Sequence, residues 1–243
     1  MENNKPDYVY DNVIQINEAD TTRKFLANVF LWMFVALGLS AAFAYIFAND
    51  HSLFNMLIDQ NTGRNTGLGT IVMFAPLAFV LIISFGFNRL SYGVLALLYI
   101  AFSVIMGISL SYLLWLFTAS SVLGVFLTTS VLFGVMAIAG YTTRQDLTKF
   151  GSILIMFLIG IIIASFVNYF LHSTGLDMII SYIGVAVFVG LTAYDVQKLK
   201  RIGQGLEYGD ASASKMALMG GLTLYLDFIN LFIFLLRIFG RRK

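Results

Sequence analysis

The chain contains the stretch Met216-Ala-Leu-Met-Gly-Gly-Leu-Thr-Leu-Tyr-Leu-Asp227-Phe-Ile-Asn-Leu-Phe-Ile-Phe-Leu-Leu236, which is almost entirely apolar yet carries an acid near its middle. A helix of about 20 residues spans the roughly 30 Å of bilayer hydrocarbon. A carboxylate at the centre of such a helix costs roughly 2.5–3.5 kcal/mol on insertion scales, so it faces a bundle interior or a wet cavity. The stretch therefore predicts a membrane helix in which Asp227 marks a functional site.

Six further runs of comparable length occur along the 243-residue chain, of which 59% of the residues are hydrophobic and 12% are charged. A soluble domain averages about 45–50% apolar and about 25% charged residues. Strands of a membrane barrel would alternate apolar and polar residues, whereas these runs are apolar on every face. We therefore expect an all-α polytopic membrane protein, a seven-transmembrane-helix bundle in the lipid bilayer. The seven predicted spans are Phe25–Ala48, Leu68–Phe87, Tyr92–Phe117, Ser121–Tyr141, Phe150–Leu171, Met178–Gln197 and Met216–Leu236.

The spans predict a simple domain organisation. We expect a polar cytoplasmic N-terminal tail over residues 1–24 and a single seven-helix membrane domain over residues 25–243. The tail is not typical of a cleavable signal peptide, because the apolar run after it has full membrane length. The two longest connections, Asn49–Gly67 and Lys198–Lys215, are rich in Gly, Asn, Asp and Ser, which predicts solvated loops.

Basic residues predict the orientation, because cytoplasmic loops of membrane proteins carry an excess of Lys and Arg. With a cytoplasmic N-terminus, ten of the 15 Lys and Arg residues fall on the cytoplasmic side. The basic C-terminus then lies on the opposite side, and the alternative is that the last helix does not fully cross. Compact loops and the absence of an organelle signal favour a bacterial plasma membrane.

A second acid, Asp195, ends the stretch Gly190-Leu-Thr-Ala-Tyr-Asp195 near the end of the sixth run. Within the predicted boundaries, no other acidic or basic residue lies inside the seven runs. Asp195 is about one helical turn from Lys198, close to the cytoplasmic boundary, whereas Asp227 follows Lys215 by 12 positions, or roughly 18 Å. The two acids can therefore meet only if the last helix begins in the cytosol, which the polar stretch 210–215 permits.

Polar residues share a helix face with each aspartate, because positions three, four and seven apart lie on one face. Around Asp227 this face carries Thr223 and Asn230, and Thr192 lies on the face of Asp195. Such a face points towards protein or water rather than lipid. We expect these three residues to support a site built from the two aspartates.

The two aspartates have a distinctive chemistry if they meet. Two carboxylates that share a low-dielectric site cannot both ionise cheaply, so the pair titrates as a unit and can sense pH. When deprotonated, the pair offers the hard oxygen ligands that calcium prefers, and acidic side chains along a pore select cations. The alternative is that each aspartate only accepts hydrogen bonds from neighbouring Tyr, Thr or Asn side chains and holds helices together.

Three stretches resemble one family of membrane proteins. Ala193-Tyr-Asp195-Val-Gln-Lys-Leu-Lys200 and Leu224-Tyr-Leu-Asp227-Phe-Ile-Asn-Leu-Phe-Ile-Phe-Leu-Leu-Arg-Ile-Phe-Gly240 resemble the last two helices of the Bax inhibitor-1 family. Tyr141-Thr-Thr-Arg-Gln-Asp146, followed by Gly151, is similar to the loop between the fourth and fifth helices of that family. The resemblance covers the whole membrane region, and the helix count agrees with it.

The resemblance implies a seven-helix bundle whose last helix is central. It further implies a calcium-leak channel that opens with pH through two membrane aspartates, which correspond to Asp195 and Asp227. An arginine at the cytoplasmic end of the second helix closes the pore in the bacterial pattern, and Arg89 is the basic residue in that place. Calcium would then be a permeating ion that the aspartates bind transiently, and no cofactor is expected.

Other site classes find little support in the sequence. The net charge is only +2, and no basic stripe with interleaved aromatics suggests a nucleic-acid partner. The chain has no cysteine, and His51 and His172 are far apart without zinc-ligand spacing. Intramembrane aspartyl proteases also use two aspartates, but no Gly-x-Gly-Asp string surrounds Asp227. We therefore expect no enzyme.

A second function from another class stays open. Some members of the family are described as non-conducting regulatory membrane proteins that bind a membrane protease or a partner in stress or cell death. Nothing in the sequence excludes such a membrane protein partner. Calcium flux through the purified protein would distinguish the two functions.

Overall fold

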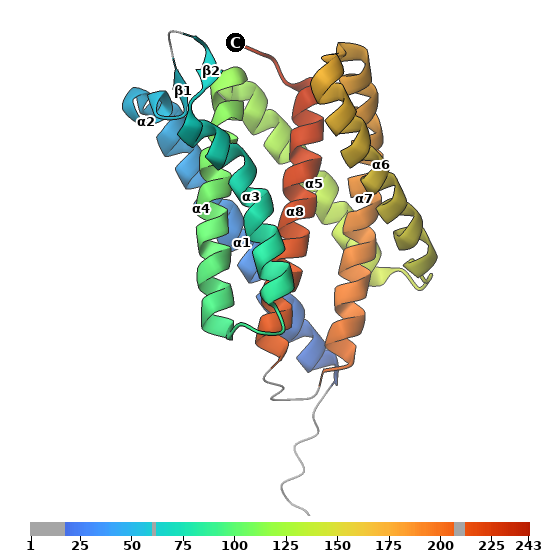
Figure 1. Cartoon of the computed structure of the whole chain (residues 1–243). Helices are drawn as coiled ribbons and strands as arrows, with labels where there is room; N and C mark the ends of the chain where they lie inside the picture. The colour runs from blue at the N-terminus through green and yellow to red at the C-terminus, as the bar shows by residue number, and fades with distance from the viewer. Residues whose placement is uncertain (1–17, 60–61, 207–211) are drawn as a thin grey trace, which may run out of the picture.

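The computed structural model describes residues 18–59, 62–206 and 212–243, which fold into a bundle of long helices (Figure 1). Seven helices in this part of the chain are long and apolar enough to cross a membrane, which confirms the predicted all-α polytopic bundle. They are α1 (Glu18–Asn49), α3 (Gly67–Gly86), α4 (Tyr92–Leu116), α5 (Ala119–Thr142), α6 (Thr148–Leu171), α7 (Thr174–Gln204) and α8 (Ala213–Phe239).

The bundle has two ends, and the described part of the chain begins at one and ends at the other (Figure 1). We call the end at which α1 and α8 begin and α7 ends the near end of the bundle. The opposite end, with the α6–α7 turn and the C-terminus, is the far end. α1 starts at Glu18, so the last residues of the predicted tail are helical, and residues 1–17 lie outside the described part.

The connection between α1 and α3 is not the plain loop that its composition predicts. It folds into the short helix α2 (His51–Asn55) and a hairpin of β1 (Ile58–Asp59) and β2 (Arg64–Asn65). The Asp50 side chain caps α2 by accepting the N–H groups of Ser52 and Leu53, which satisfies donors that a helix start leaves free. The predicted loop therefore contains a short helix, which capping by Asp50 stabilises.

α7 continues beyond the predicted end of the sixth span at Gln197 and ends at Gln204. The prediction of a solvated loop starting at Lys198 was wrong for its first residues, because they form an amphipathic helical extension. Leu199 and Gly203 are buried against neighbouring helices, while Lys198 and Arg201 are exposed. The extension leaves Asp195 more than two turns inside the helix, instead of at its end.

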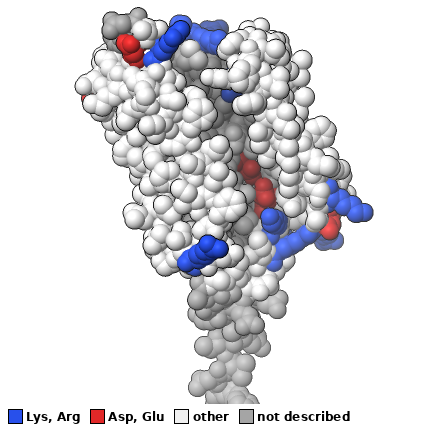
Figure 2. Space-filling view, in the orientation of Figure 1, with Lys and Arg blue, Asp and Glu red and all other residues white. Residues whose placement is uncertain are grey.

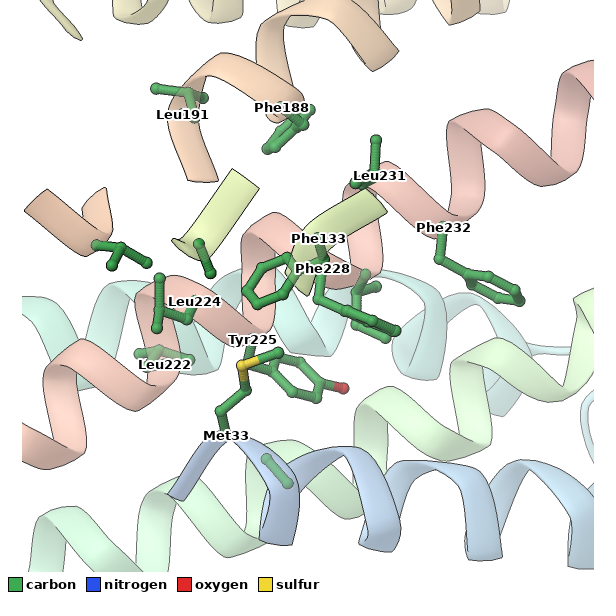
Figure 3. Packing of buried hydrophobic residues seen from close by; sticks show 14 of the residues in the cluster. Met33, Phe133, Phe188, Leu191, Leu222, Leu224, Tyr225, Phe228, Leu231 and Phe232 are labelled. Atoms are coloured by element: carbon green, nitrogen blue, oxygen red, sulfur yellow. The ribbon is translucent and has the colours of Figure 1, made fainter. Parts of the chain in front are cut away.

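α8 is the centre of the bundle, as the resemblance implies. In its most apolar 18-residue segment 61% is buried inside the bundle, whereas the corresponding share for α6 is 11%. It packs against α1, α4, α5 and α7. Figure 3 shows Met33, Phe133 and the α8 residues Tyr225 and Phe228 meeting in the core. Most of α8 is covered by protein, apart from a partly exposed stripe that includes Met219, Thr223, Leu226 and Asn230. Asp227 is buried beside this stripe, so its carboxyl group lies among helices instead of in lipid.

Close helix contacts in the bundle depend on missing side chains. A Cβ atom added to Gly140 of α5 would lie 2.1 Å from the backbone oxygen of Ala193 in α7, whereas one added to Gly134 would meet nothing within 4 Å. Small residues allow such backbone approach between membrane helices. Gly140 therefore sets how closely α5 can pack on the part of α7 that carries Asp195.

We expect Gly140→Ala to destabilise the protein by about 1–3 kcal/mol, because the backbones of α5 and α7 must move apart. Gly134→Ala on the same helix is the matched control and should be neutral or stabilising by up to about 1 kcal/mol, because alanine favours helix. Thermal unfolding in detergent measures both. Equal effects of the two substitutions would contradict the packing.

Candidate functional site

Asp227 and Asp195 meet across the contact between α8 and α7. The Asp227 side chain is buried, with its residue 5% exposed, and Asp195 is half-buried. Their carboxyl groups interact directly with each other. Two carboxyl groups can bond to each other only through a proton, because an ionised carboxyl group can only accept. One shared proton would therefore hold the pair together, whereas two negative charges would repel each other.

One oxygen of the pair has no partner in the protein. Asp227 Oδ2 is buried and has no hydrogen bond to any of the described residues. Buried polar atoms are nearly always hydrogen-bonded, so such an exception calls for an explanation. A purely structural role would require hydrogen bonds from Tyr, Thr or Asn side chains to the aspartates. Among the described residues, no such bond reaches either aspartate. A free carboxyl oxygen instead suits a cation or a water molecule.

A cavity of about 330 Å³ between α3, α7 and α8 reaches Asp195, while Asp227 lies behind its wall. Asp195, Thr223 and Gly220 form part of its wall. In Figure 2, acidic side chains lie recessed in a groove on this face, with basic side chains beside them towards the near end. The complete lining is Ser84, Phe87, Asp195, Lys198, Leu199, Ile202, Met216, Met219, Gly220 and Thr223.

The basic residue at this cavity is Lys198, one turn after Asp195 on α7. Lys198 is exposed, lines the cavity and interacts electrostatically with the Asp195 carboxyl group. In the sequence, the spacing of Lys198 from Asp195 indicated only that Asp195 lies near the membrane boundary. That spacing of three residues was also a signal for a countercharge, because such positions face each other on a helix.

Arg89 lies in the exposed turn between α3 and α4, outside the lining of the cavity. No ion pair joins it to an acid in the described part of the chain. Lys215 Nζ holds this turn to the start of α8 by donating to the Leu90 carbonyl oxygen at 2.6 Å. The structure therefore does not bring Arg89 to the aspartates, and its role as a latch stays a prediction.

The three polar residues expected to support the aspartates bond within their own helices. Thr192 and Thr223 donate to the carbonyl groups four residues earlier, at 2.8 and 3.1 Å. Asn230 does the same at 2.8 Å. They supply small polar surface near the pair, and of the three only Thr223 lines the cavity.

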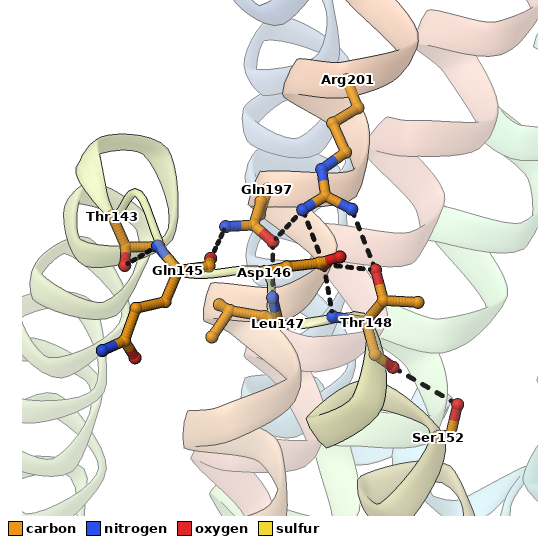
Figure 4. Close-up of polar contacts among 8 residues, drawn as sticks. All are labelled: Thr143, Gln145, Asp146, Leu147, Thr148, Ser152, Gln197 and Arg201. Atoms are coloured by element: carbon orange, nitrogen blue, oxygen red, sulfur yellow. Dashed lines mark hydrogen bonds and ion pairs between the residues drawn. The ribbon is translucent and has the colours of Figure 1, made fainter.

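A polar clamp missed by sequence reasoning fixes the near end of α7 (Figure 4). Gln197 Nε2 donates to the Gln145 carbonyl oxygen at 2.7 Å, and Gln197 Oε1 accepts the Leu147 N–H at 2.9 Å. Arg201 forms an ion pair with Asp146 at 2.7 Å. The clamp attaches the α5–α6 loop to the turn of α7 directly after Asp195.

The clamp does not titrate near neutral pH. Hydrogen bonds from the Thr148 side chain and backbone, together with Arg201, hold the pKa of Asp146 well below its usual range. A lowered pKa in the folded state stabilises the fold above the unfolded value of about 4, and this contribution is lost only as the pH falls further. The clamp therefore keeps its charges through neutral pH.

A second buried network fastens the opposite side of α8. The Tyr225 and Ser40 hydroxyl groups are hydrogen-bonded at 2.6 Å, and Ser40 donates to the Ser103 carbonyl oxygen at 2.7 Å. This joins α8 to α1 and α4. α8 is thus anchored on one side and faces α7 with its aspartate on the other.

The sequence matches a known protein family. Residues 22–243 match the family described as "Inhibitor of apoptosis-promoting Bax1". The chain belongs to this family. The match confirms the resemblance seen in the last two helices, and the protein is an integral multi-pass membrane protein.

Bacterial members of this Bax inhibitor family cover nearly the whole chain. The inner membrane protein YbhL of Escherichia coli K12 is 44% identical over 96% of this chain and 97% of its own length. The uncharacterized protein RP147 of Rickettsia prowazekii is 39% identical over 91% of each chain. The uncharacterized membrane protein M6_Spy0327 of Streptococcus pyogenes is 32% identical over 95% of this chain and 98% of its own.

We expect Gln197→Ala to destabilise the protein by about 1–3 kcal/mol, because it leaves polar groups of the α5–α6 loop without their partner. Gln204→Ala, at the exposed end of the same helix, is the matched control and should have little effect. Thermal unfolding and proteolysis of the α5–α6 loop measure the difference. A Gln197→Ala protein as stable and as protease-resistant as the control would show that the clamp does not hold α7.

Proposed function

We propose that this protein is a pH-sensitive calcium-leak channel, gated by protonation of the Asp195–Asp227 pair. The observation that supports it most is a pair of interacting carboxyl groups inside the bundle, one of which, that of Asp195, lines a cavity at the near end. A membrane protein gains no stability from burying such a pair that apolar packing would not also give. The pair therefore suggests a function that needs protons or cations at this depth.

The shared proton is the closing element of the proposed gate. While it is present, the two carboxyl groups attract each other and hold α7 against α8. When it leaves, two negative charges lie together in a low-dielectric site and repel each other. The repulsion is relieved by separating the helices or by binding a cation, and both favour conduction. Flux should therefore rise with pH through the titration of the pair.

The site suits a passing calcium ion. Two aspartates supply at most four carboxylate oxygens, whereas a tightly held calcium ion takes about six to eight oxygen ligands. No cluster of three or more His, Asp or Glu side chains adds to them within the described residues. Asp227 Oδ2, buried and unpartnered by those residues, is the ligand that we assign first to the ion.

Basic residues at the near end determine the charge at the mouth of the cavity that Asp195 lines. Lys198 beside Asp195 supplies a countercharge to the deprotonated pair. Arg89 follows Phe87, which lines the cavity, so a shift of the near end of α3 would carry Arg89 towards the same mouth. We propose that Arg89 acts as a latch in such a shifted state.

We further propose that the protein lies in a bacterial plasma membrane with its near end in the cytoplasm. The inner-membrane relative supports the location, and the basic residues at the near end support the orientation.

We expect Asp227→Asn and Asp195→Asn each to abolish the pH dependence of calcium flux into proteoliposomes, because an amide cannot exchange the shared proton. Asp20→Asn, at the exposed start of α1, keeps a similar charge change away from the pair and should leave the pH profile unchanged. The profile is measured with an entrapped calcium dye across a pH series.

A pH profile that survives both aspartate substitutions would rule out the pair as the sensor. No flux through the purified protein at any pH, together with co-purification of one specific membrane protein, would support the non-conducting regulatory function instead.

A further inference from the structure

α7 and α8 run antiparallel, and their shared surface, which we call the seam, extends from one end of the bundle to the other (Figure 1). On α7, Asp195, Phe188 and Asp177 fall on one face, because 7 and 18 residues are close to two and five helical turns. Asp177 lies about 27 Å along the helix from Asp195, which is nearly the thickness of the hydrocarbon layer. The seam therefore connects the aspartate pair to the far end.

A second charged pair closes the far end of the seam. Arg237 Nη1 of α8 donates to Asp177 Oδ1 of α7 at 3.1 Å. Both side chains line a cavity of about 350 Å³ between the starts and ends of α6, α7 and α8. The seam thus has a cavity with an acidic side chain at each end, one at Asp195 and one at Asp177.

Between these cavities the seam is filled by the ring of Phe234. Phe234 is 8% exposed, and its ring lies 5.9 Å from the ring of Phe188. A Cβ atom added to Gly184 of α7 would lie 2.6 Å from the Phe234 ring, so the ring rests directly on the α7 backbone. The Arg237 guanidinium covers the ring from the far side, 5.7 Å from its centre. The Phe234 ring thus contacts the α7 backbone on one side and the Arg237 guanidinium of the far-end ion pair on the other.

We propose that Phe234 is the hydrophobic barrier of the far half of the pathway, and that the Arg237–Asp177 pair keeps it seated on Gly184. This rests on the proposed function, since a barrier matters only to a protein that conducts. Hydrophobic constrictions gate by excluding water, and a cation without water or oxygen ligands is strongly disfavoured. An ion that reaches Asp227 from the near cavity therefore stops below Phe234 until the ring moves.

The proposal divides the gate between two places on one pair of helices. The aspartate pair responds to protons at the near half, while the ion pair fixes the barrier at the far half. Separation of α7 from α8 at Asp195 and Asp227 would lift Phe234 from Gly184, because α7 is one continuous helix. Opening at the sensor and opening at the barrier are then one movement.

The first test is calcium flux into proteoliposomes at a pH at which the wild type conducts least. Phe234→Ala should raise this flux about tenfold, the change that 1.4 kcal/mol of barrier produces. Phe232→Ala is the matched control, because Phe232 is 7% exposed and packs on Phe126 of α5 instead of α7. Arg237→Gln should raise the flux in the same direction, since the ring loses its cover.

A second test needs no flux and uses the absence of cysteine from the native chain. Leu191 is 4% exposed and lies on the seam between Phe188 and Asp195. A membrane-impermeant maleimide added from the far side should label Leu191→Cys in the Phe234→Ala background. It should not label Leu191→Cys alone or combined with Phe232→Ala.

The two tests separate failure of the barrier from failure of the channel. If Phe234→Ala behaves like Phe232→Ala in both flux and labelling, Phe234 is not the barrier. If the wild type and all variants conduct nothing, the proposed function fails, and labelling alone decides the barrier. Labelling restricted to the Phe234→Ala background supports it, and equal labelling in all backgrounds overturns it.

Discussion

The burial of the Asp227 carboxyl group at the centre of the bundle is the constraint on which the rest of the structure depends. α8 is the most enclosed helix, so its acid can reach only other side chains or a cavity. The partner it finds is Asp195, and one proton shared by the two carboxyl groups would remove an unfavourable negative charge. The close packing of α5 on α7 at Gly140 and the clamp at Gln197 both hold α7 where that partnership forms.

The two sides of α8 differ in a way that suits a gate. On one side, Tyr225 is hydrogen-bonded to Ser40, and aromatic rings from α5 pack on Phe228. On the other side lies the seam with α7, which has an acidic and a basic side chain at each end and the rings of Phe188 and Phe234 between them. A fixed side and a side that carries titratable groups allow α7 to move against a stable remainder.

Much of the fold could be predicted from the sequence, because the bilayer reduces it to counting long apolar runs, and two acids inside such runs locate the site. The register between helices could not be predicted. The Asp195–Asp227 contact depended on where α8 begins, and it begins at Ala213 within the polar stretch. The end of α7 was also hidden, because an amphipathic extension resembles a polar loop when it is rich in Lys and Arg. Gln197 and Phe234 looked ordinary in the sequence, since their importance comes from what faces them across a neighbouring helix.

The shared proton is the central claim, and infrared difference spectroscopy of the carboxylic-acid C=O stretch tests it most directly. If the pair holds a proton in the closed protein, the purified wild type should show a protonated carboxyl band that decays as the pH rises. Asp227→Asn should lack this band. A wild type without the band at any pH that preserves the closed fold, or a band unchanged in Asp227→Asn, would contradict the claim.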